Sequence, residues 1–250
     1  MKISIITATY NSYPAIIECI NSIANQTVNP EHLIIDGGSK DLTLSTIKTS
    51  QSVSKWISEP DKGIYDALNK GIGLSSGEII GLLHSDDLLA SNHILEKITQ
   101  VFEETGTNVL YGDLVYVDKE DTSKVIRYWK SQAFKPSLLK RGWMPAHPTV
   151  FAKREVYEKH GLFDLSFQIA ADYDMMLRIF NDDDLNKVYL PEVITRMRVG
   201  GASNKSLKNI IRKSKEDYRA MKKNRLSFPT WSLICKNLSK LPQFFKVSIR

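Results

Sequence analysis

IIGLLHSDD, at residues 79–87, is an apolar run that ends abruptly in two adjacent carboxylates. Its apolar part has the length of a β-strand that is covered on both faces of a sheet. Ligands of open α/β sheets bind beyond the carboxyl ends of the strands, so the acids stand where a site would lie. Because two carboxylates this close repel each other, the pair predicts a hard divalent metal that carries phosphate oxygens. The alternative is a helix cap, in which Ser85, Asp86 and Asp87 only start the next helix.

The chain before this stretch repeats one pattern of strand, polar corner and helix. Strands are expected at residues 2–8, 32–36 and 53–58, and helices at residues 13–25 and 64–74. Repeated units of this kind are typical of a mostly parallel sheet with right-handed crossovers. The pattern therefore predicts an α/β architecture of a nucleotide-binding type, which by itself does not define a function.

The rhythm changes after the acid pair. A helix is expected at residues 92–104, and the short strands that follow it are typical of hairpins. The later strands are expected at residues 109–111, 114–117, 125–128, 149–152, 188–190 and 194–199, and the later helices at 154–160, 169–180 and 206–223. Gly161 closes the helix that starts at Arg154.

The composition describes a globular chain with a sizeable core. It has 250 residues, a mass of 28.4 kDa and 42% hydrophobic residues, enough for one large α/β domain or two small ones. No apolar run approaches the roughly 18 to 20 residues of a membrane-spanning helix, so we expect a cytoplasmic protein. Cys19 and Cys235 are distant in sequence and lack metal-ligand spacing, which argues against a disulfide framework or a zinc site.

The charge is concentrated in the last fifty residues. Residues 201–250 carry thirteen Lys or Arg against Glu216 and Asp217, which leaves a mildly acidic body in a chain of formal charge +6. Apolar side chains stand among these cations, so the tail is expected to lie on an anionic membrane surface. The alternative is a helix packed on the body with a solvated basic face. No nucleic-acid partner is expected, because the stretch lacks a recognisable reading module.

Further motifs stand at fixed places along the chain. They are SIITATYN at residues 4–11, IIDGGS at 34–39 followed by Asp41, PDKGIYDALNKG at 60–71, GLFD at 161–164 and ADYD at 171–174. Together with the Ser85-Asp86-Asp87 corner, their order and spacing resemble the family 2 glycosyltransferases of the GT-A fold, over residues 2–204. Within that family the chain looks most like bacterial enzymes that build capsular, exopolysaccharide or O-antigen repeats.

The resemblance implies a fold and a reaction. The fold would be a Rossmann-like three-layer α/β/α sandwich with a mostly parallel mixed central sheet. Residues 1–112 would bind the nucleotide sugar, residues 113–204 the acceptor, and residues 205–250 would form a basic helical tail. The reaction would be an inverting transfer of a sugar from a nucleoside-diphosphate sugar, UDP above all, to a hydroxyl of a glycan or lipid-linked saccharide. The rival hypotheses are a nucleotidyltransferase and a non-catalytic module that binds nucleotide or glycan.

The resemblance also implies roles for single residues. Asp172 would be the catalytic base, and Asp87, with Asp86 as a second contact, would hold Mn²⁺ or Mg²⁺. Predicted contacts with the nucleotide sugar are Thr7, Tyr10, Asp36, Lys62, Gly63, Asn69 and Asp86. Apart from the resemblance, His147 in a loop could contact diphosphate, metal or acceptor, and Arg196 and Arg198, two apart on a strand, could close over phosphates from one face. The alternatives are structural. They are a turn aromatic for Tyr10, a helix cap for Asp36, surface charge for Lys62, a structural role for His147 and ordinary surface pairing for the two arginines.

Three positions depart from the family pattern. His84 stands where many members carry the first acid of an Asp-x-Asp motif, so metal binding would rest mainly on Asp87. Leu68 stands where many relatives have Arg before Asn, which removes a nucleotide contact. Ala171 replaces the Glu that often precedes the catalytic Asp.

The spacing of two acids separates their expected roles. Asp172 and Asp174 are two residues apart, so on a helix their side chains diverge by about 200° and cannot face the same acceptor. Arg178 lies four residues after Asp174, a spacing at which helical side chains pair. We therefore assign Arg178 to Asp174 and leave Asp172 free for chemistry; a simple helix cap is the alternative for Asp172.

Overall fold

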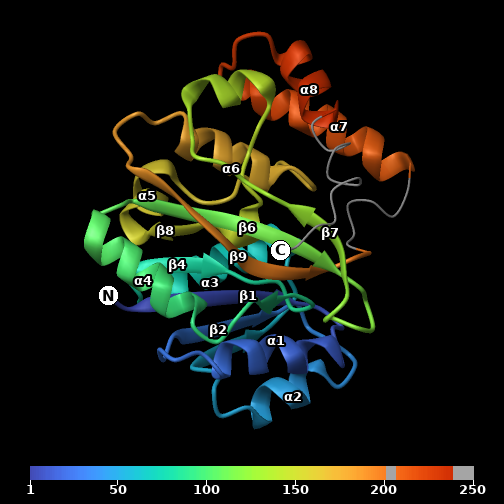
Figure 1. The fold of residues 1–250 in the computed structure, drawn as a ribbon. Helices are drawn as coiled ribbons and strands as arrows, with labels where there is room; N and C mark the ends of the chain where they lie inside the picture. Colours follow the sequence, from blue (N-terminus) through green and yellow to red (C-terminus); the bar gives the residue numbers. More distant parts are fainter. Residues whose placement is uncertain (201–206, 239–250) are drawn as a thin grey trace.

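One nine-stranded sheet runs through the computed structural model, which describes residues 1–200 and 207–238 (Figure 1). The strand order is β3-β2-β1-β4-β8-β6-β9-β5, and β7 pairs with β6 outside this path. The strands are β1 Ile3–Thr9, β2 Glu31–Asp36, β3 Lys55–Ser58, β4 Ile79–Leu82, β5 Leu88–Leu89, β6 Val109–Val117, β7 Val125–Trp129, β8 Phe151–Lys153 and β9 Lys187–Arg198.

The sheet is mixed, as predicted, and its two halves differ in strand direction. The pairs β1–β2, β1–β4 and β2–β3 are parallel, which confirms the strand-helix repeats of the first half. In the second half β8 runs antiparallel to β4 and β6, and β7 and β5 run antiparallel to β6 and β9. Only β6–β9 is parallel there. Parallel pairing is therefore less dominant than expected, because the hairpin of β6 and β7 and the reversed β8 occupy the second half.

Two long strands replace four short ones that the sequence predicted. Residues 109–111 and 114–117 belong to the single strand β6, and residues 188–190 and 194–199 fall largely in β9. The apolar pattern is interrupted at Gly112 and Asp113 in β6 and at Pro191 and Glu192 in β9. The two strands pair across these interruptions, with register shifts around Asp113 that absorb them.

Helices cover both faces of the sheet. They are α1 Ala15–Ala24, α2 Thr43–Thr49, α3 Ile64–Leu74, α4 Ile94–Thr105, α5 Arg154–His160, α6 Ala171–Phe180, α7 Leu207–Lys223 and α8 Pro229–Leu238, with 3-10 turns η1 Pro136–Arg141 and η2 His147–Thr149. Alternate residues of the buried strands face opposite layers. Ile5 and Ile79 pack with α1 and α4, whereas Ile6 and Ile80 pack with α3, α5 and α6. The result is the predicted three-layer arrangement.

A glycine brings α3 close to the sheet. A Cβ on Gly71 would lie 2.3 Å from Cγ2 of Ile6, a distance that no side chain could occupy. Gly71 closes the motif at residues 60–71, so this part of the motif serves the packing of α3 on β1. The close contact thereby fixes the C-terminal part of α3 against β1.

The helices of the predicted tail pack on the body. Ala220 and Met221 of α7 belong to the same core cluster as α3 and α6. Lys236 of α8 is buried, with its ammonium group 2.9 Å from Asp217 and 3.1 Å from the ring centroid of Tyr173. Residues 207–238 of the tail therefore pack on the body, whereas Leu241, Phe244 and Phe245 lie outside the described residues. The domain boundary at residue 204 stays a prediction.

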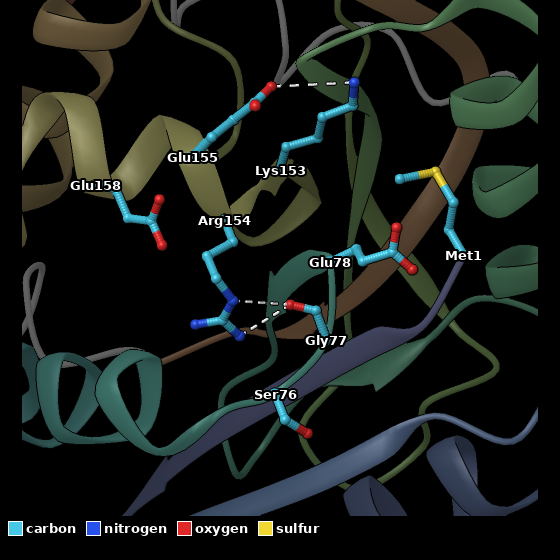
Figure 2. Close-up of a pocket in the computed structure, with 8 residues that line it drawn as sticks. All are labelled: Met1, Ser76, Gly77, Glu78, Lys153, Arg154, Glu155 and Glu158. Atoms are coloured by element: carbon cyan, nitrogen blue, oxygen red, sulfur yellow. Dashed lines mark hydrogen bonds and ion pairs between the residues drawn. The ribbon is translucent and has the colours of Figure 1, made fainter.

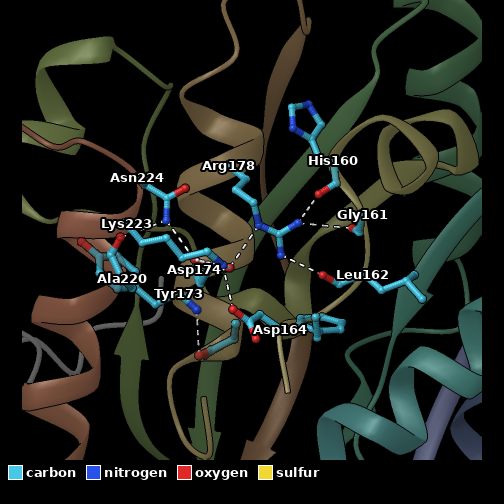
Figure 3. A network of polar contacts seen from close by, with 12 residues as sticks. His160, Gly161, Leu162, Asp164, Tyr173, Asp174, Arg178, Ala220, Lys223 and Asn224 are labelled. Atoms are coloured by element: carbon cyan, nitrogen blue, oxygen red, sulfur yellow. Dashed lines mark hydrogen bonds and ion pairs between the residues drawn. The ribbon is translucent and has the colours of Figure 1, made fainter. Parts of the chain in front are cut away.

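A polar network ties α7 to α6 around Asp174 (Figure 3). Arg178 donates to Asp174 at 3.1 Å, which confirms the pairing expected from their spacing. Lys223 and Asn224 reach the same carboxylate at 3.1 and 2.9 Å. Arg178 also donates to the carbonyls of residues 160–162, so it holds the start of the GLFD motif in place.

Both cysteines are free, and Cys19 is buried in the core. Within residues 1–200 and 207–238, no helix is long and apolar enough to cross a membrane.

Candidate active site

The carboxyl ends of β1, β2 and β3 meet at one edge of the sheet. In the parallel register Thr9 lies beside Asp36, and Asp36 beside Ser58. The chain leaves β4 at the same edge, because β4 is parallel to β1, and forms the Ser85-Asp86-Asp87 corner. Ser12, after β1, and Ser85 are hydrogen-bonded at 2.8 Å. The first three predicted motifs and the acid pair therefore converge at this edge.

An exposed aromatic ring lies beside a glycine turn. Tyr10 is 61% exposed, and a Cβ on Gly37 would lie 3.4 Å from its ring and 2.6 Å from Oδ2 of Asp61. Lys62 and Gly63 follow Asp61 and are also exposed. The arrangement leaves a ring face and a backbone turn accessible, as stacking of a nucleotide base would require. Asp61 was not among the predicted site residues.

Two residues predicted to contact the nucleotide, Thr7 and Asp36, are buried and contact other side chains of the protein. Thr7 is fully buried, with its hydroxyl 3.1 Å from Nε2 of His32. Burial lowers the pKa of His32 to about 3, so this ring is neutral. Asp36 is also fully buried and accepts hydrogen bonds from Ser39 and from Ser58, the latter at 2.6 Å. This geometry does not support direct contact of Thr7 with a base, and it gives Asp36 the role of fixing the glycine turn.

The helix α3 connects this edge to the second half of the chain. Asn69 donates to the carbonyl of Phe163 and accepts from its N–H, both at 2.9 Å. Its amide is thus used to hold the GLFD motif, which does not support the predicted contact with nucleotide. Tyr65, one helical turn earlier, donates to Asp172 at 3.3 Å and to the carbonyl of Ile169 at 2.7 Å. Tyr65 and Asn69 are four residues apart and therefore lie on the same face of α3, so the spacing could have indicated that both face the second half of the chain.

The two acids of the corner differ in environment. Asp86 is exposed, whereas Asp87 is fully buried. Oδ1 of Asp87 accepts from the backbone N–H of Arg198 at 3.3 Å, and its Oδ2 is buried without a hydrogen-bond partner in the described part of the chain. Burial raises the pKa of Asp87 well above its usual range, and the charge of Asp86 adds to the effect.

An orphaned carboxylate oxygen beside an exposed acid fits a divalent cation. A cation at Asp87 would replace the proton that burial favours there and would satisfy Oδ2. Among residues 1–200 and 207–238, no group of three or more His, Cys, Asp or Glu could hold a metal by itself. Mg²⁺-type sites need only one or two carboxylates when substrate phosphates supply further oxygens. Asp87 and Asp86 therefore fit a cation that arrives with a diphosphate.

The predicted arginine pair divides into a structural and an accessible member. Arg198 is buried and donates to the carbonyls of Asp86 and Lys119, and it pairs with Glu18 at 2.8 Å. Its guanidinium therefore fixes the acid corner from behind, which does not support a direct phosphate contact. Arg196 lies beside Leu88 in the sheet and is partly exposed.

The predicted base lies in the first turn of α6. Asp172 is 22% exposed at its side chain, and its Oδ1 accepts from Tyr65 at 3.3 Å and from the N–H of Tyr173 at 2.8 Å. Its Oδ2 lies 3.3 Å from Nδ1 of His147. Burial by itself raises the pKa of Asp172, but the hydrogen bond and the electrostatic effect of His147, together with the charges of Lys213 and Lys236, outweigh it and hold the pKa below its usual range. The carboxylate is ionised and partly open, as a general base must be.

A second histidine extends this contact to the acid corner. Nε2 of His147 lies 2.9 Å from Nε2 of His84, the residue before Ser85. Burial lowers the pKa of His84 to about 3, so its ring is neutral. His147 therefore lies between the acid corner and Asp172, and its predicted contact with diphosphate or acceptor stays a prediction.

An acid from the basic tail caps the helix that carries Asp172. The carboxylate of Glu216 in α7 accepts from the N–H groups of Gln168, Ile169 and Ala170, at 2.8 Å for Ile169 and 3.0 Å for Ala170. Backbone N–H groups before a helix attract a negative charge, so the contact stabilises the start of α6. Sequence reasoning missed Glu216; its only signal was that it is one of two acids in a basic stretch.

A separate pocket lies at the other end of the central strands (Figure 2). It has a volume of about 400 Å³ and is lined by residues that precede β1 and β4, such as Met1 and Gly77, together with the start of α5. Arg154 points across it and donates to the carbonyl of Gly77 at 2.8 Å. The amino ends of parallel strands are not where α/β sheets bind ligands, so we assign no site here.

Comparisons with known proteins agree with this geometry. The model of a family described as Glycosyl transferase family 2 matches residues 4–161. The chain is 29% identical to a "PGL/p-HBAD biosynthesis glycosyltransferase" of Mycobacterium bovis, over 80% of this chain and 78% of that protein. It is 28% identical to an uncharacterized glycosyltransferase of Haemophilus influenzae, over 83% of this chain and 68% of that protein.

Solved structures share the fold. TarS of S. aureus (residues 1–349) with UDP-GlcNAc gives a TM-score of 0.68 at 18% identity, over 90% of this chain and 65% of that one. The mannosyltransferase PcManGT of Pyrobaculum calidifontis with GDP-Man and Mn²⁺ gives 0.65 at 18% identity, over 97% and 70%. This chain spans only 39% of the longer TarS chain. The predicted GT-A fold is confirmed.

Proposed function

The chain belongs to glycosyl transferase family 2, and from this premise we propose that it transfers a sugar from a nucleoside-diphosphate sugar, UDP above all, to a hydroxyl acceptor. The acceptor would be a glycan or a lipid-linked saccharide, and the pathway the synthesis of a bacterial surface polysaccharide. The observation that carries the proposal is a chain of contacts: His84, next to the acid corner, contacts His147, and His147 contacts Asp172. This connection supports a single site in which one group would bind the diphosphate and another would remove the proton.

The reaction we propose is a single displacement with inversion. The acceptor hydroxyl gives its proton to Asp172 while its oxygen forms a bond to the anomeric carbon. The bond from that carbon to the diphosphate oxygen breaks on the opposite face, and the electron pair leaves with the nucleoside diphosphate. Asp172 is suited to this role because it is ionised, oriented by Tyr65 and partly open.

The diphosphate would be held at the acid corner. The nucleotide base would stack on Tyr10, next to Lys62 and Gly63. Asp87 and Asp86 would hold Mn²⁺ or Mg²⁺, which stabilises negative charge on the departing diphosphate when it is bound. Arg198 donates to the carbonyl of Asp86 and so keeps Asp86 in place. Arg196 is partly exposed and would be the arginine that can reach phosphate.

A panel of nucleotide sugars tests the proposal. We expect binding and cleavage of one or a few UDP-sugars in Mn²⁺, measured by calorimetry and by release of UDP, with GDP- and dTDP-sugars as comparison. Cleavage to a nucleoside monophosphate and a sugar phosphate would instead indicate attack on the diphosphate. Binding without any cleavage, in the presence of candidate acceptors, would favour a non-catalytic binding module.

We further propose that α8 brings the site to an anionic membrane at its cytoplasmic face. Trp231, Ile234 and Leu238 recur at helical spacing on the outer side of α8, and Phe228 precedes them at 75% exposure. The inner side carries Ser232, bonded to the carbonyl of Lys140, and the buried Lys236. An apolar stripe within a tail of net charge about +11 is complementary to anionic lipid, where each cation near the surface contributes about 1 kcal/mol.

Vesicle binding tests this surface without disturbing the inner contacts of α8. The double change Trp231→Glu and Leu238→Glu should abolish sedimentation with phosphatidylglycerol vesicles, because it places two anions in the stripe. Leu42→Glu is the matched control, since Leu42 is 55% exposed next to α2, at the opposite end of the molecule from α8 (Figure 1). Equal sedimentation of the wild-type protein, the double variant and Leu42→Glu would contradict the proposal. So would binding of the wild-type protein to phosphatidylcholine vesicles as strong as its binding to phosphatidylglycerol vesicles.

A further inference from the structure

We propose that His147, oriented by His84, is the positioning residue of Asp172 and couples the base to the acid corner. The proposal deepens the proposed function and rests on it, because Asp172 needs this positioning only if it takes a proton. Nε2 of His84 lies 2.9 Å from Nε2 of His147, and Nδ1 of His147 lies 3.3 Å from Oδ2 of Asp172. The three side chains come from the end of β4, from η2 and from α6.

The hydrogen-bond network assigns the proton of each ring. An ionised Asp172 can only accept, so Nδ1 of His147 carries the proton that faces it. In a neutral His147 ring Nε2 is then the acceptor, and Nε2–H of His84 must donate to it. This leaves Nδ1 of His84 as an acceptor, and Nδ1 is a buried atom that has no hydrogen-bond partner among the residues that the structure describes. Asp172 thus sets which nitrogen of His147 is protonated, and the hydrogen bond from His84 holds the His147 ring in that orientation.

The contacts divide the two oxygens of Asp172 between different partners. Oδ1 is held by Tyr65 and by the N–H of Tyr173, whereas Oδ2 is held by His147. A carboxylate oxygen can accept a second hydrogen bond, so the exposed rim of Asp172 can still receive a hydroxyl. Loss of the contact with His147 would leave Oδ2 without this hydrogen-bond donor and the carboxylate free to turn about Cβ–Cγ.

The position of His84 links this arrangement to the donor. His84 directly precedes Ser85-Asp86-Asp87, and the carbonyl of His84 also accepts from the thiol of Cys19 at 3.4 Å. The acid corner is therefore connected to Asp172 through the two histidine rings. His84 replaces the first acid of the Asp-x-Asp pattern. The corner thus has one acid fewer, and its histidine contacts His147, which contacts Asp172.

Several charged or titratable groups face Asp172 from the elements around it. They are His147 from η2, Tyr65 from α3, Lys213 from α7 and Lys236 from α8. Burial favours the protonated acid, and the N–H of His147 is the main contact that opposes burial. Its removal should therefore raise the pKa of Asp172, so activity is lost at a higher pH as the solution is acidified.

Two substitutions at one position test the proposal. His147→Leu removes the donor and should lower kcat about 10- to 100-fold, move the acidic limb of the kcat profile to higher pH and leave the KM for the nucleotide sugar unchanged. His147→Asn restores an N–H near the place of Nδ1 and should recover most of kcat and the original acidic limb. A pH-independent loss that Asn does not rescue, or a loss that appears only in KM, would overturn the proposal.

Nitrogen-15 NMR of the histidine rings supplies a readout that needs no substrate. In the wild-type protein His147 should carry its proton on Nδ1, and in Asp172→Asn this preference should weaken. A wild-type ring protonated on Nε2 overturns the inference even if sugar transfer is found. A ring protonated on Nδ1, in a protein that cleaves no nucleotide sugar, overturns the proposed function and with it the positioning role.

Discussion

Asp172→Asn should lower turnover by roughly 10² or more while the affinity for nucleotide sugar changes little. The substitution keeps the size of the side chain and the oxygen that Tyr65 and the N–H of Tyr173 can reach, but it removes the group that takes the proton. Donor binding should survive because the acid corner and Tyr10 lie on other elements. Initial rates and calorimetric titration of the nucleotide sugar measure the two effects separately.

Asp174→Asn is the matched control for this prediction. Asp174 is fully buried and carries the ion pairs of Arg178 and Lys223. Its substitution should lower the free energy of unfolding, on the order of 3 kcal/mol for a broken buried pair, with little change in turnover of the folded fraction. A normal rate in Asp172→Asn, or an inactive but folded Asp174→Asn, would contradict the assignment of the base to Asp172.

Asp87→Ala should abolish turnover in Mn²⁺ or Mg²⁺ and weaken the binding of nucleotide sugars. Without Asp87 the cation would lose its buried ligand, and the diphosphate would lose the cation that neutralises its charge. The fold should survive, because Asp87 is a buried acid whose Oδ2 has no hydrogen-bond partner in the described ranges. Rates with and without EDTA, and titration with UDP in Mn²⁺, provide the measurement.

Asp87→Asn separates charge from shape in the same experiment. It keeps an oxygen for the N–H of Arg198 at Oδ1 and removes only the anion. Both Asp87 variants should lose the stimulation by metal to the same degree. Full activity in EDTA, or in Asp87→Ala, would contradict the assignment of the metal to this corner.

The sequence predicted those parts of the fold and site that are local. The apolar run after Gly77 is β4, the strand-helix repeats before it pair in parallel, and Arg178 pairs with Asp174 at four-residue spacing. Each of these follows from periodicity or from the geometry of one element. The helix α3 was predicted with its observed bounds because its apolar stripe is uninterrupted.

The parts that could not be predicted depend on contacts between distant elements. Asn69 and Asp36 carry the residue types of a ligand site, but their partners Phe163 and Ser58 are known only once the sheet is assembled. Glu216 was counted as a minor charge in a basic tail, because nothing local indicates that α7 crosses the start of α6. The contact of His147 with Asp172 likewise joins η2 to α6.

The stereochemistry of the product tests the central claim most directly. The protein is incubated with the nucleotide sugar that the panel identifies, and the anomeric configuration of the first product is followed by proton NMR before it can equilibrate. We expect inversion, so that an α-linked donor gives a β-configured product, and we expect Asp172→Asn to lose this product. A product that retains the configuration of the donor, formed at the same rate by Asp172→Asn, would contradict it.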